Sequence, residues 1–494
     1  MPETIATAVY KYGTHKLALT ISEDKLGLRS SKDAFEVSVP LRVIRQDVQE
    51  GLFGGIFASL LLVKPLNVEG DTSTYESLRR DALQLAVQRV LKGLKRRYSL
   101  LFQHLEVLTP FFYIAELSRY TRALPWIRYL ANAMLNESGV LEWMSREVVK
   151  ALSHCTDLPR AEQPITWIRV VEVEPCSRES PTGFAERVAA VGKAAQALVN
   201  LQVSIVTPFG LLAEGVKVRL HPLLRDPLLL ARLGRCKVAT KLLNFEDHLH
   251  TIMGVKEILS STRRKSLIRS VKVVRGPTKA AVVKRYRDYT AAKWLAALVL
   301  TPHLPKPRSG PRSRMEAEYH YNTVLYNKGF LVPNPLLLDL RRLISAYEFV
   351  EGEDLLKLLN KSPAPPPYRD LGCTLAQVHK SGVSLWDANP SNFIASSRGI
   401  YIVDLEQARE LRSVVEAAWD LAVATFYSIP FNVSGATARA KLIAEGYVTC
   451  GGNPGVVLEA SKPRYALPFI PVSPPNVLER VRRALLRVAG ANGS

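Results

Sequence analysis

The chain has 494 residues, of which 47% are hydrophobic and 22% charged, and its formal net charge is +21. This composition is typical of a globular protein with several cores, and it excludes wholesale disorder. The excess of positive charge indicates affinity for something anionic, such as an acidic protein, a nucleic-acid-containing partner or a phospholipid surface. No specific DNA-reading motif, zinc finger or RNA-recognition motif accompanies the basic residues, so specific base reading is not supported.

The five cysteines are scattered and form no C-x-x-C pair, which favours a reducing compartment and predicts neither a zinc site nor a disulfide framework. The first residues lack the basic and apolar regions of a signal peptide. The longest apolar run, Gly51–Val63, is too short to span a bilayer. It is predicted to be a buried core segment, with an interfacial anchor as the alternative. A cytoplasmic protein without a transmembrane segment is therefore expected.

The N-terminal half reads as a mixed α/β region without recognisable chemistry. Residues 1–64 are predicted to form a small β-rich unit, with strands at Ile5–Tyr12, Leu17–Ile21 and Phe35–Ile44. Residues 65–245 are predicted to be mainly helical and of unknown role. Within them, Tyr75–Tyr98 shows apolar residues at close to a 3.6-residue period, which indicates a helix. A further strand is expected at Thr166–Val173.

Short strands begin again after residue 246. Val255–Leu259 and Leu267–Val274 are predicted as strands joined by a turn at residues 260–265 that contains no glycine. Without glycine, the backbone cannot approach a phosphate closely. Hydroxyl and guanidinium groups can contact phosphate instead. Candidate ATP-binding residues in the turn are Ser261, Thr262 and Arg263, and a plain basic surface turn is the alternative.

The next two elements, a strand and a helix, are predicted to be joined by an ion pair. Ala280–Lys284 is a small apolar strand that ends in a lysine, and a helical stretch at about residues 312–328 follows. Near the start of that helix, Glu316 is placed to pair with Lys284. Leu343–Val350 is then predicted as another apolar strand.

The most informative pattern is a short hairpin with polar residues at its ends. Phe393–Ala395 and Ile400–Val403 are apolar runs joined by a turn that contains glycine. Because paired strands lie about 5 Å apart, the side chains entering and leaving the hairpin converge. Asn392 enters and Asp404 leaves, so their oxygens can hold one Mg²⁺. Asp387, just upstream, is left to orient a hydroxyl group.

This D-x-x-x-x-N spacing followed by a second aspartate resembles the catalytic and metal-binding loops of protein kinases. The resemblance implies ATP and Mg²⁺ as cofactors, with Lys284 at the ATP phosphates and Asp387 at the acceptor hydroxyl. It also implies a hinge whose backbone groups at Glu348 and Val350 pair with adenine. Asp420 would open an apolar helix and bond to the backbone of the catalytic loop, as a structural support.

The resemblance is closest to the compact, atypical branch of the superfamily. The stretch R-S-R-M-E-A-E at the predicted helix start is similar to that of the KEOPS-complex and RIO-type kinases, and the aminoglycoside and lipopolysaccharide kinases are similar more distantly. Four features depart from the common kinase pattern. D-F-G is replaced by Asp404-Leu405-Glu406, which keeps the metal ligand but loses the glycine. Leu385 stands where a histidine is expected, Asn389 stands where Ser/Thr protein kinases carry lysine, and the glycine-rich loop is missing.

The resemblance therefore implies an α+β fold with a bilobal protein-kinase-like C-terminal half, comprising a small β-rich N-lobe and a mainly helical C-lobe, after a mixed α/β N-terminal half. The expected parts are an N-lobe with hinge at 246–352, a C-lobe at 353–470 and a basic C-terminal helix at 471–494. The implied function is a Mg-ATP-dependent phosphotransferase, as an atypical Ser/Thr-type protein kinase. A small-molecule kinase and an ATP-binding pseudokinase scaffold are the alternatives.

Overall fold

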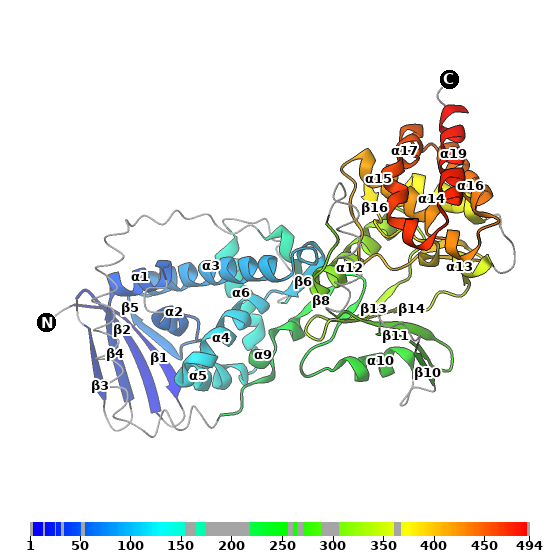
Figure 1. Ribbon diagram of the computed structural model, residues 1–494. Coiled ribbons are helices and arrows are strands. Elements are labelled where there is room, and N and C mark those ends of the chain that lie inside the picture. The colour runs from blue at the N-terminus through cyan, green and yellow to red at the C-terminus, as the bar shows by residue number, and fades with distance from the viewer. Residues whose placement is uncertain are drawn as a thin grey trace. The chain divides into compact units, whose positions relative to one another are not determined.

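In the computed structural model the chain forms two compact units, which are described separately (Figure 1). The N-terminal unit comprises residues 1–234 and 240–242, and the C-terminal unit comprises residues 235–239 and 243–494. The structure describes residues 3–12, 15–24, 26–30, 34–50, 55–153, 165–173, 218–254, 260–263, 270–287, 306–359 and 367–491. Among these residues, no helix combines the length and the apolar character needed to cross a membrane.

The N-terminal unit begins with a five-stranded sheet in the order β3-β4-β2-β1-β5. Its strands are β1 Thr4–Tyr12, β2 His15–Ser22, β3 Gly27–Ser30, β4 Ala34–Pro40 and β5 Asn67–Gly70. The first two predicted strands are confirmed. The third was predicted to run to Ile44, but it ends at Pro40, and helix α1 (Leu41–Glu50) starts at the next residue. Ile44 and Val48 are buried one helical turn apart, which is a helical and not a strand periodicity.

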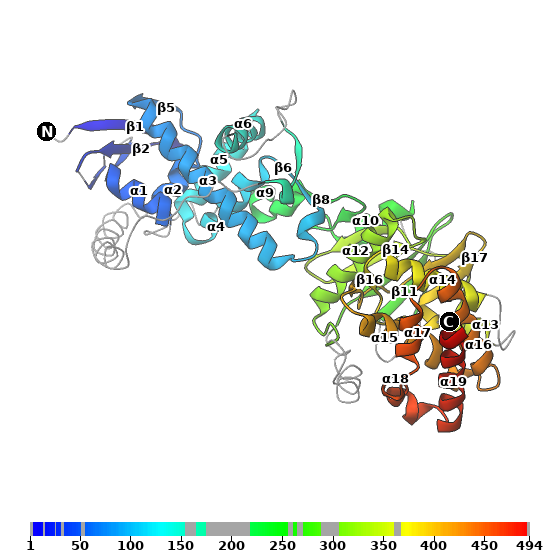
Figure 2. The same ribbon diagram turned by 90° about the horizontal axis from the view of Figure 1, so that it is seen from above.

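Helices pack on this sheet and on one another to form the rest of the unit's core (Figure 2). They are α2 Ile56–Leu61, α3 Thr72–Arg97, α4 Phe111–Ala123, α5 Pro125–Leu135, α6 Val140–Leu152 and α9 Pro222–Arg225. The predicted helix at Tyr75–Tyr98 is confirmed as α3. Its first turn is capped by Asp71, whose carboxylate accepts the N–H groups of Ser73 and Thr74.

The apolar run at Gly51–Val63 is a core segment where the structure describes it. Five of the six residues of α2 are buried. The buried carboxylate of Asp47 accepts hydrogen bonds from the N–H groups of Gly55 at 2.9 Å and Phe57 at 2.8 Å, so it satisfies the start of this helix.

A three-stranded sheet, β7-β6-β8, completes the unit. Its strands are β6 Leu105–Leu108, β7 Trp167–Arg169 and β8 Ala231–Leu233. The strand predicted at Thr166–Val173 is present but shorter, because a 3-10 turn at Val170–Glu172 follows β7.

The C-terminal unit opens with a six-stranded sheet in the order β10-β11-β12-β14-β13-β9. The bounds are β9 Lys237–Val238, β10 Ser260–Arg263, β11 Ser270–Arg275, β12 Ala280–Arg285, β13 Pro335–Asp339 and β14 Ile344–Glu348. Among the described residues, helices α10 Phe245–Met253 and α12 Pro311–Asn327 accompany it. Phe245, Leu249 and Met253 of α10 pack on a core that includes Ala281 of β12. Because side chains alternate along a strand, Lys284 lies on the opposite face.

The turn predicted at residues 260–265 is wrong in its first part. Residues 260–263 form β10 and pair with β11 in the register Thr262↔Val273. Backbone groups used in a strand ladder are not available to wrap a phosphate, so Ser261, Thr262 and Arg263 do not sit in a loop as predicted. Residues 264–269, and the strand predicted at Val255–Leu259, lie outside the described residues.

The second lobe of this unit is mainly helical. Its helices are α13 Leu355–Leu358, α14 Pro367–Lys380, α15 Val414–Phe426, α16 Ala436–Thr449, α17 Pro454–Ala460, α18 Pro463–Ala466 and α19 Pro475–Ala491. Its short strands are β15 Glu353–Asp354, β16 Val383–Ser384, β17 Phe393–Ser396, β18 Gly399–Ile402 and β19 Arg409–Glu410. The predicted hairpin is confirmed as β17 and β18, which pair from Phe393↔Ile402 to Ser396↔Gly399. The α+β fold class with a bilobal second half is also confirmed.

Helices α14 and α16 approach each other unusually closely. A Cβ added at Gly372 would collide with the carbonyl oxygen of Ile443, and one added at Gly446 would collide with that of Arg369. At the end of the same contact, Cys373 and Cys450 form a disulfide with a Cα–Cα distance of 5.1 Å. The sequence predicted no disulfide framework, and it did not predict this single disulfide. Two cysteines that are 77 residues apart in sequence give no local signal of their proximity.

The close contact predicts that Gly372→Ala destabilises the C-terminal unit, because a methyl group cannot enter without separating the two helices. We expect a loss of about 1–3 kcal/mol in the free energy of unfolding, the usual cost of overpacking. Urea unfolding followed by circular dichroism measures it. Gly490→Ala in α19 is the matched control, since its Cβ would meet nothing within 4 Å. Equal stability of the two variants would contradict the close contact.

Candidate active site

A buried ion pair joins the sheet of the C-terminal unit to α12. The Lys284 ammonium group donates a hydrogen bond to Oε1 of Glu318. The same nitrogen lies 3.3 Å from Oδ1 of Asp404, which follows β18. The side chains of the lysine and the two acids are 15%, 5% and 6% exposed, so water screens their charges little. Residues from three separate elements thus meet at one point.

The glutamate in this pair is Glu318 and not Glu316, which corrects the sequence prediction. Both residues lie on α12 and both are buried. Residues two positions apart on a helix point about 200° away from each other, so only one of them can face a given strand. The glutamate that faces β12 is the second one.

Tyr286 holds the second oxygen of Glu318. It lies two residues after Lys284, just beyond the end of β12, and its N–H donates to the carbonyl oxygen of Leu343 at 3.0 Å. The extended pairing thus continues to Tyr286, and both side chains project from the same face. The Tyr286 hydroxyl donates to Oε2 of Glu318 and lies 3.1 Å from the hydroxyl of Ser345. Burial, followed by the charge of Glu318, raises the pKa of Tyr286 well above its ordinary value, so it remains a donor at neutral pH.

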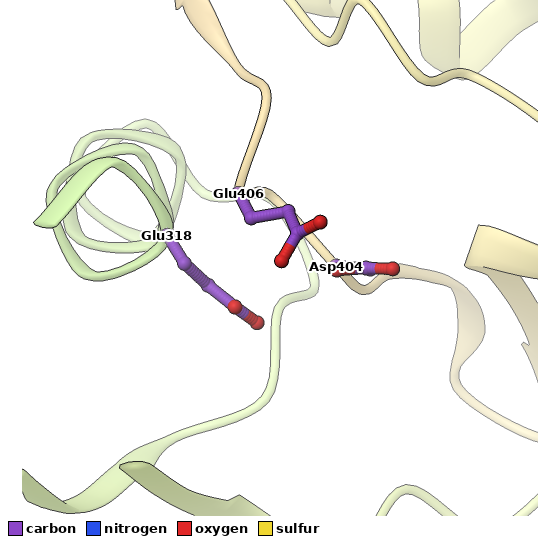
Figure 3. A group of neighbouring side chains, drawn as sticks. All are labelled: Glu318, Asp404 and Glu406. Atoms are coloured by element: carbon purple, nitrogen blue, oxygen red, sulfur yellow. The ribbon is translucent and has the colours of Figure 1, made fainter. Parts of the chain in front are cut away.

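Three carboxylates gather at this point, and two of them contact Lys284 (Figure 3). Oxygens of Glu318, Asp404 and Glu406 lie within 4.8 Å of one another, and all three residues are buried. Glu406 is balanced by the buried guanidinium of Arg314, at 3.4 Å. Arg314 also donates to the carbonyl oxygen of Arg287. Such a group of buried oxygens suits a hard divalent cation.

The loop between β16 and β17 presents Asp387, and its geometry is fixed by side-chain amides. Nδ2 of Asn389 donates to Oδ1 of Asp387 at 2.8 Å. Nδ2 of Asn392 donates to the carbonyl oxygen of Asp387 at 2.9 Å. The carbonyl oxygen of Asn392 accepts the N–H of Val403 at 2.9 Å, so the hairpin brings Asn392 beside the residue that precedes Asp404.

Asp420 anchors the start of this loop. Its two carboxylate oxygens accept the N–H groups of Leu385 at 2.7 Å and Trp386 at 2.6 Å. It is completely buried, and Oδ2 also lies 3.1 Å from Nε2 of His379. The prediction that Asp420 opens a helix is wrong, because α15 begins at Val414.

The helix starts there because Ser413 caps it, with its side chain accepting the N–H of Glu416. This Ser-x-x-Glu spacing is the signature of a capping box and could have been recognised in the sequence. It places Asp420 in the middle of α15, where the carboxylate has no role in capping the helix start.

Two residues of the site have a positive backbone φ, which is uncommon for residues other than glycine. Trp386 has φ 61° and Asp404 has φ 63°. The Trp386 conformation is held from outside by Trp419, whose indole N–H donates to the Trp386 carbonyl oxygen at 2.8 Å. Such conformations persist where the surroundings determine them, and they are typical of functional sites.

The hinge candidates lie at the end of β14. The N–H of Glu348 donates to the carbonyl oxygen of Asn334 at 2.9 Å, and the Glu348 carboxylate accepts from the Asn334 side chain at 2.8 Å. Val350 follows and is buried. The side chains of Ser261, Thr262 and Arg263 lie outside the described residues, so the structure does not place them relative to the site.

Sequence reasoning missed three members of the site: Glu318, Glu406 and Arg314. The first had a signal, since the stretch that contains Glu316 contains a second glutamate. The other two form a buried pair between α12 and the segment after β18. An arginine and a glutamate 92 residues apart give no local pattern.

Comparison with known proteins gives relatives that are kinases. The chain is 32% identical over 104 residues to the serine/threonine-protein kinase RIO2 of Saccharomyces cerevisiae, covering 19% of this chain and 24% of that protein. It is 28% identical over 131 residues to the probable serine/threonine-protein kinase BUD32 homolog of Archaeoglobus fulgidus, covering 26% of this chain and 65% of that protein. The chain therefore spans less than two thirds of the length of these relatives. No family model matches the chain.

The fold and the sequence relatives place the chain in the protein-kinase-like superfamily. Within that superfamily, the matched stretches of the chain are similar to the atypical kinases RIO2 and BUD32. Among solved structures, the Rio2 kinase of Chaetomium thermophilum in its ADP/Mg²⁺-phosphoaspartate complex matches 50% of this chain and 76% of that chain. At 17% identity and a TM-score of 0.26, that likeness adds no further argument.

Proposed function

We propose that the C-terminal unit is a Mg-ATP-dependent phosphotransferase that acts on a protein hydroxyl group, as an atypical Ser/Thr-type protein kinase. The observation that carries the proposal is the convergence of the Lys284–Glu318 pair on Asp404. This arrangement supports phosphoryl transfer, in which catalysis consists mainly of positioning and charge neutralisation.

In the proposed reaction, Lys284 contacts the α- and β-phosphates of ATP. Glu318 keeps the ammonium group in place, and Tyr286 keeps Glu318 from turning away. The hinge backbone at Glu348 and Val350 would pair with adenine. Ser261, Thr262 and Arg263 remain candidates for contact with the phosphates.

The residues present fit a Mg²⁺ ion. Asp404 and Asn392 would hold it, and the buried Glu406 adds a third oxygen group on the same side. These are hard oxygen donors of the kind that Mg²⁺ prefers. When bound, the ion would neutralise charge on the ATP phosphates.

Asp387 is the candidate for orienting the acceptor hydroxyl. The residue is 7% exposed, and Asn389 holds one of its carboxylate oxygens, which leaves the carboxylate in a defined orientation. An oriented carboxylate can accept the hydroxyl hydrogen bond and align the oxygen with the γ-phosphate. Asp420 keeps the loop in place through its backbone.

The corrected ion pair predicts a difference between two glutamate variants. Glu318→Gln removes the charge that holds Lys284, so we expect the KM for ATP to rise about tenfold or more, the worth of a charge-assisted hydrogen bond. Glu316→Gln should leave the KM for ATP near the wild-type value. Steady-state ATPase kinetics on both variants measures this. The reverse ranking would mean that Glu316 is the functional partner.

Transfer of label from [γ-³²P]ATP tests the proposed function. Purified wild-type protein with Mg²⁺ should phosphorylate itself or an added protein, and omission of Mg²⁺ should prevent it. A protein that binds ATP but transfers no label to protein or to small molecules would instead be a pseudokinase scaffold, which the missing glycine-rich loop favours.

A small-molecule kinase is the second candidate. It is favoured by Asn389, which stands where Ser/Thr protein kinases carry lysine and which bonds to Asp387 in this structure. The same labelling experiment with added metabolites separates the two: label on metabolites alone supports this candidate. The net charge of +21 is the basis for proposing an acidic or nucleic-acid-containing partner in either case.

A further inference from the structure

Arg235 is the first residue of the C-terminal unit and directly follows the last residue of the first segment of the N-terminal unit. Its guanidinium group makes a fork of hydrogen bonds. One nitrogen donates to Oδ1 of Asn322 on α12 at 2.8 Å, and the other donates to Oδ1 of Asn334 at 2.9 Å. The group also lies over the ring of Tyr326, 3.6 Å from the ring centroid. All three partners are in the C-terminal unit.

The backbone around Arg235 is also hydrogen-bonded to the C-terminal unit. Its N–H donates to the hydroxyl of Tyr319 at 3.2 Å. Two residues later, β9 begins and pairs in parallel with β13. We call residues 235–239 the entry strand, since they contain the two-residue strand β9, which extends the N-lobe sheet, while Arg235 contacts α12.

The contacts on α12 lie next to the residue that holds Lys284. Tyr319 follows Glu318 directly, and Asn322 lies one helical turn further on. Asn322 also donates to the carbonyl oxygen of Pro333 at 2.9 Å, on the segment that leads into β13. Rotation or translation of α12 would break these bonds, so the entry strand fixes the direction in which Glu318 points.

The second hydrogen bond of the Arg235 guanidinium, to Asn334, connects Arg235 to the hinge. Asn334, which accepts from Arg235, donates its own side-chain N–H to the Glu348 carboxylate at 2.8 Å. It also accepts the backbone N–H of Glu348 at 2.9 Å. The Arg235 guanidinium is thus connected through two successive hydrogen bonds to Glu348, the candidate for pairing with adenine. It also bonds directly to α12, the helix that carries Glu318.

We propose that Arg235 is a positioning residue of the active site: it aligns α12 and the hinge, so that the Lys284–Glu318 pair forms only when the entry strand is docked. Catalysis would then depend on the segment that joins the two units of the chain. The proposal concerns the same site as the proposed function and rests on it for the catalytic consequence, although the effect on the ion pair is independent of any activity.

The test is made on the full-length chain with two readouts. The first is the rate at which an amine-reactive acetylating reagent modifies Lys284, measured by mass spectrometry of the peptide that contains it. The second is the KM for ATP and the kcat of ATP turnover. Arg235→Ala should speed the modification of Lys284 and raise the KM for ATP, each by about tenfold, because it removes the charge-assisted bonds that hold α12.

Arg342→Ala is the matched control. Arg342 lies in the turn between β13 and β14 and makes an ion pair at 2.9 Å with Glu246 of α10, a different helix from α12. It should leave both readouts unchanged. Arg235→Lys keeps the positive charge but lacks the planar group that makes two hydrogen bonds. Both of its readouts should lie between those of the wild type and of Arg235→Ala. It also provides a folded variant if Arg235→Ala does not fold.

The outcomes are separable. Unchanged Lys284 modification in folded Arg235→Lys and Arg235→Ala proteins overturns the proposal, whatever their activity. Faster modification in the Arg235 variants and in Arg342→Ala alike would show general loosening of the lobe and would overturn it as well. A wild-type protein without ATP turnover would refute the proposed function alone, because the modification rates still report the ion pair.

Discussion

Asp404→Asn should abolish Mg²⁺-dependent ATP turnover, with a fall in kcat of at least about 10²-fold, the scale of losing one group that stabilises charge in the transition state. The substitution preserves the shape of the side chain but removes its charge. Asp404 faces both Lys284 and the carboxylate of Glu406, so the loss affects the metal site and the lysine together. Coupled-assay ATPase rates at increasing Mg²⁺ concentration measure the effect.

The control for this experiment is Asp370→Asn, which removes an exposed carboxylate from the first turn of α14 in the same lobe. It should retain wild-type turnover. If Asp404→Asn retained turnover at ordinary Mg²⁺ concentration, the assignment of Asp404 as a metal ligand would be wrong, since no neutral amide can replace a carboxylate at a divalent ion without loss.

Asp387→Asn should separate binding from transfer. Asp387 lies on the catalytic loop and is not part of the Lys284–Glu318–Asp404 cluster, so the affinity for Mg²⁺·ATP should remain close to that of the wild type. The kcat should fall about 10²–10⁴-fold, the usual contribution of a positioned acid–base group. Asn389 can still donate to the remaining carbonyl oxygen, which keeps the loop geometry.

Both predictions are measured on the same Asp387→Asn preparation. Binding of a fluorescent ATP analogue gives the nucleotide affinity, and single-turnover transfer of label gives the rate of transfer. A parallel loss of binding and transfer would show that Asp387 contributes to the nucleotide site and does not act at the acceptor. Full retention of transfer would remove it from the mechanism.

The local patterns in the sequence predicted much of the fold around the site. The hairpin between Asn392 and Asp404 follows from two apolar runs and a glycine turn, and the structure contains it with the expected pairing. Helices α3 and α12 and strand β12 also lie where their periodicity and composition indicate. These elements are determined by neighbouring residues, which a sequence displays directly.

The errors arise where distant residues decide the outcome. Glu316 and Glu318 are equally good candidates from sequence, and the choice depends on the rotation of α12 against β12. The Arg314–Glu406 pair and the Cys373–Cys450 disulfide join residues that are far apart in the chain. The error in placing Asp420 at a helix start has another cause. The capping box at Ser413 is a local signal that marks the true start of α15, and the prediction did not use it.

The role proposed for the entry strand also depends on distant residues and could not be predicted from the sequence. Nothing around Arg235 in the sequence indicates an active-site role, since a single arginine in a basic chain is unremarkable. Its contacts to Asn322 and Asn334 depend on the docking of β9 beside β13. Long-range pairing of this kind is what a three-dimensional structure adds to a motif.

The central claim is that Lys284, Asn392 and Asp404 form an ATP·Mg²⁺ site, and calorimetric titration of the wild-type protein with ATP tests it most directly. With Mg²⁺ present, ATP should bind at one site per chain, and replacing Mg²⁺ by EDTA should weaken binding about tenfold or more, because the phosphate charge then lacks its counter-ion. Absence of ATP binding, or an affinity that is the same with Mg²⁺ and with EDTA, would contradict the account.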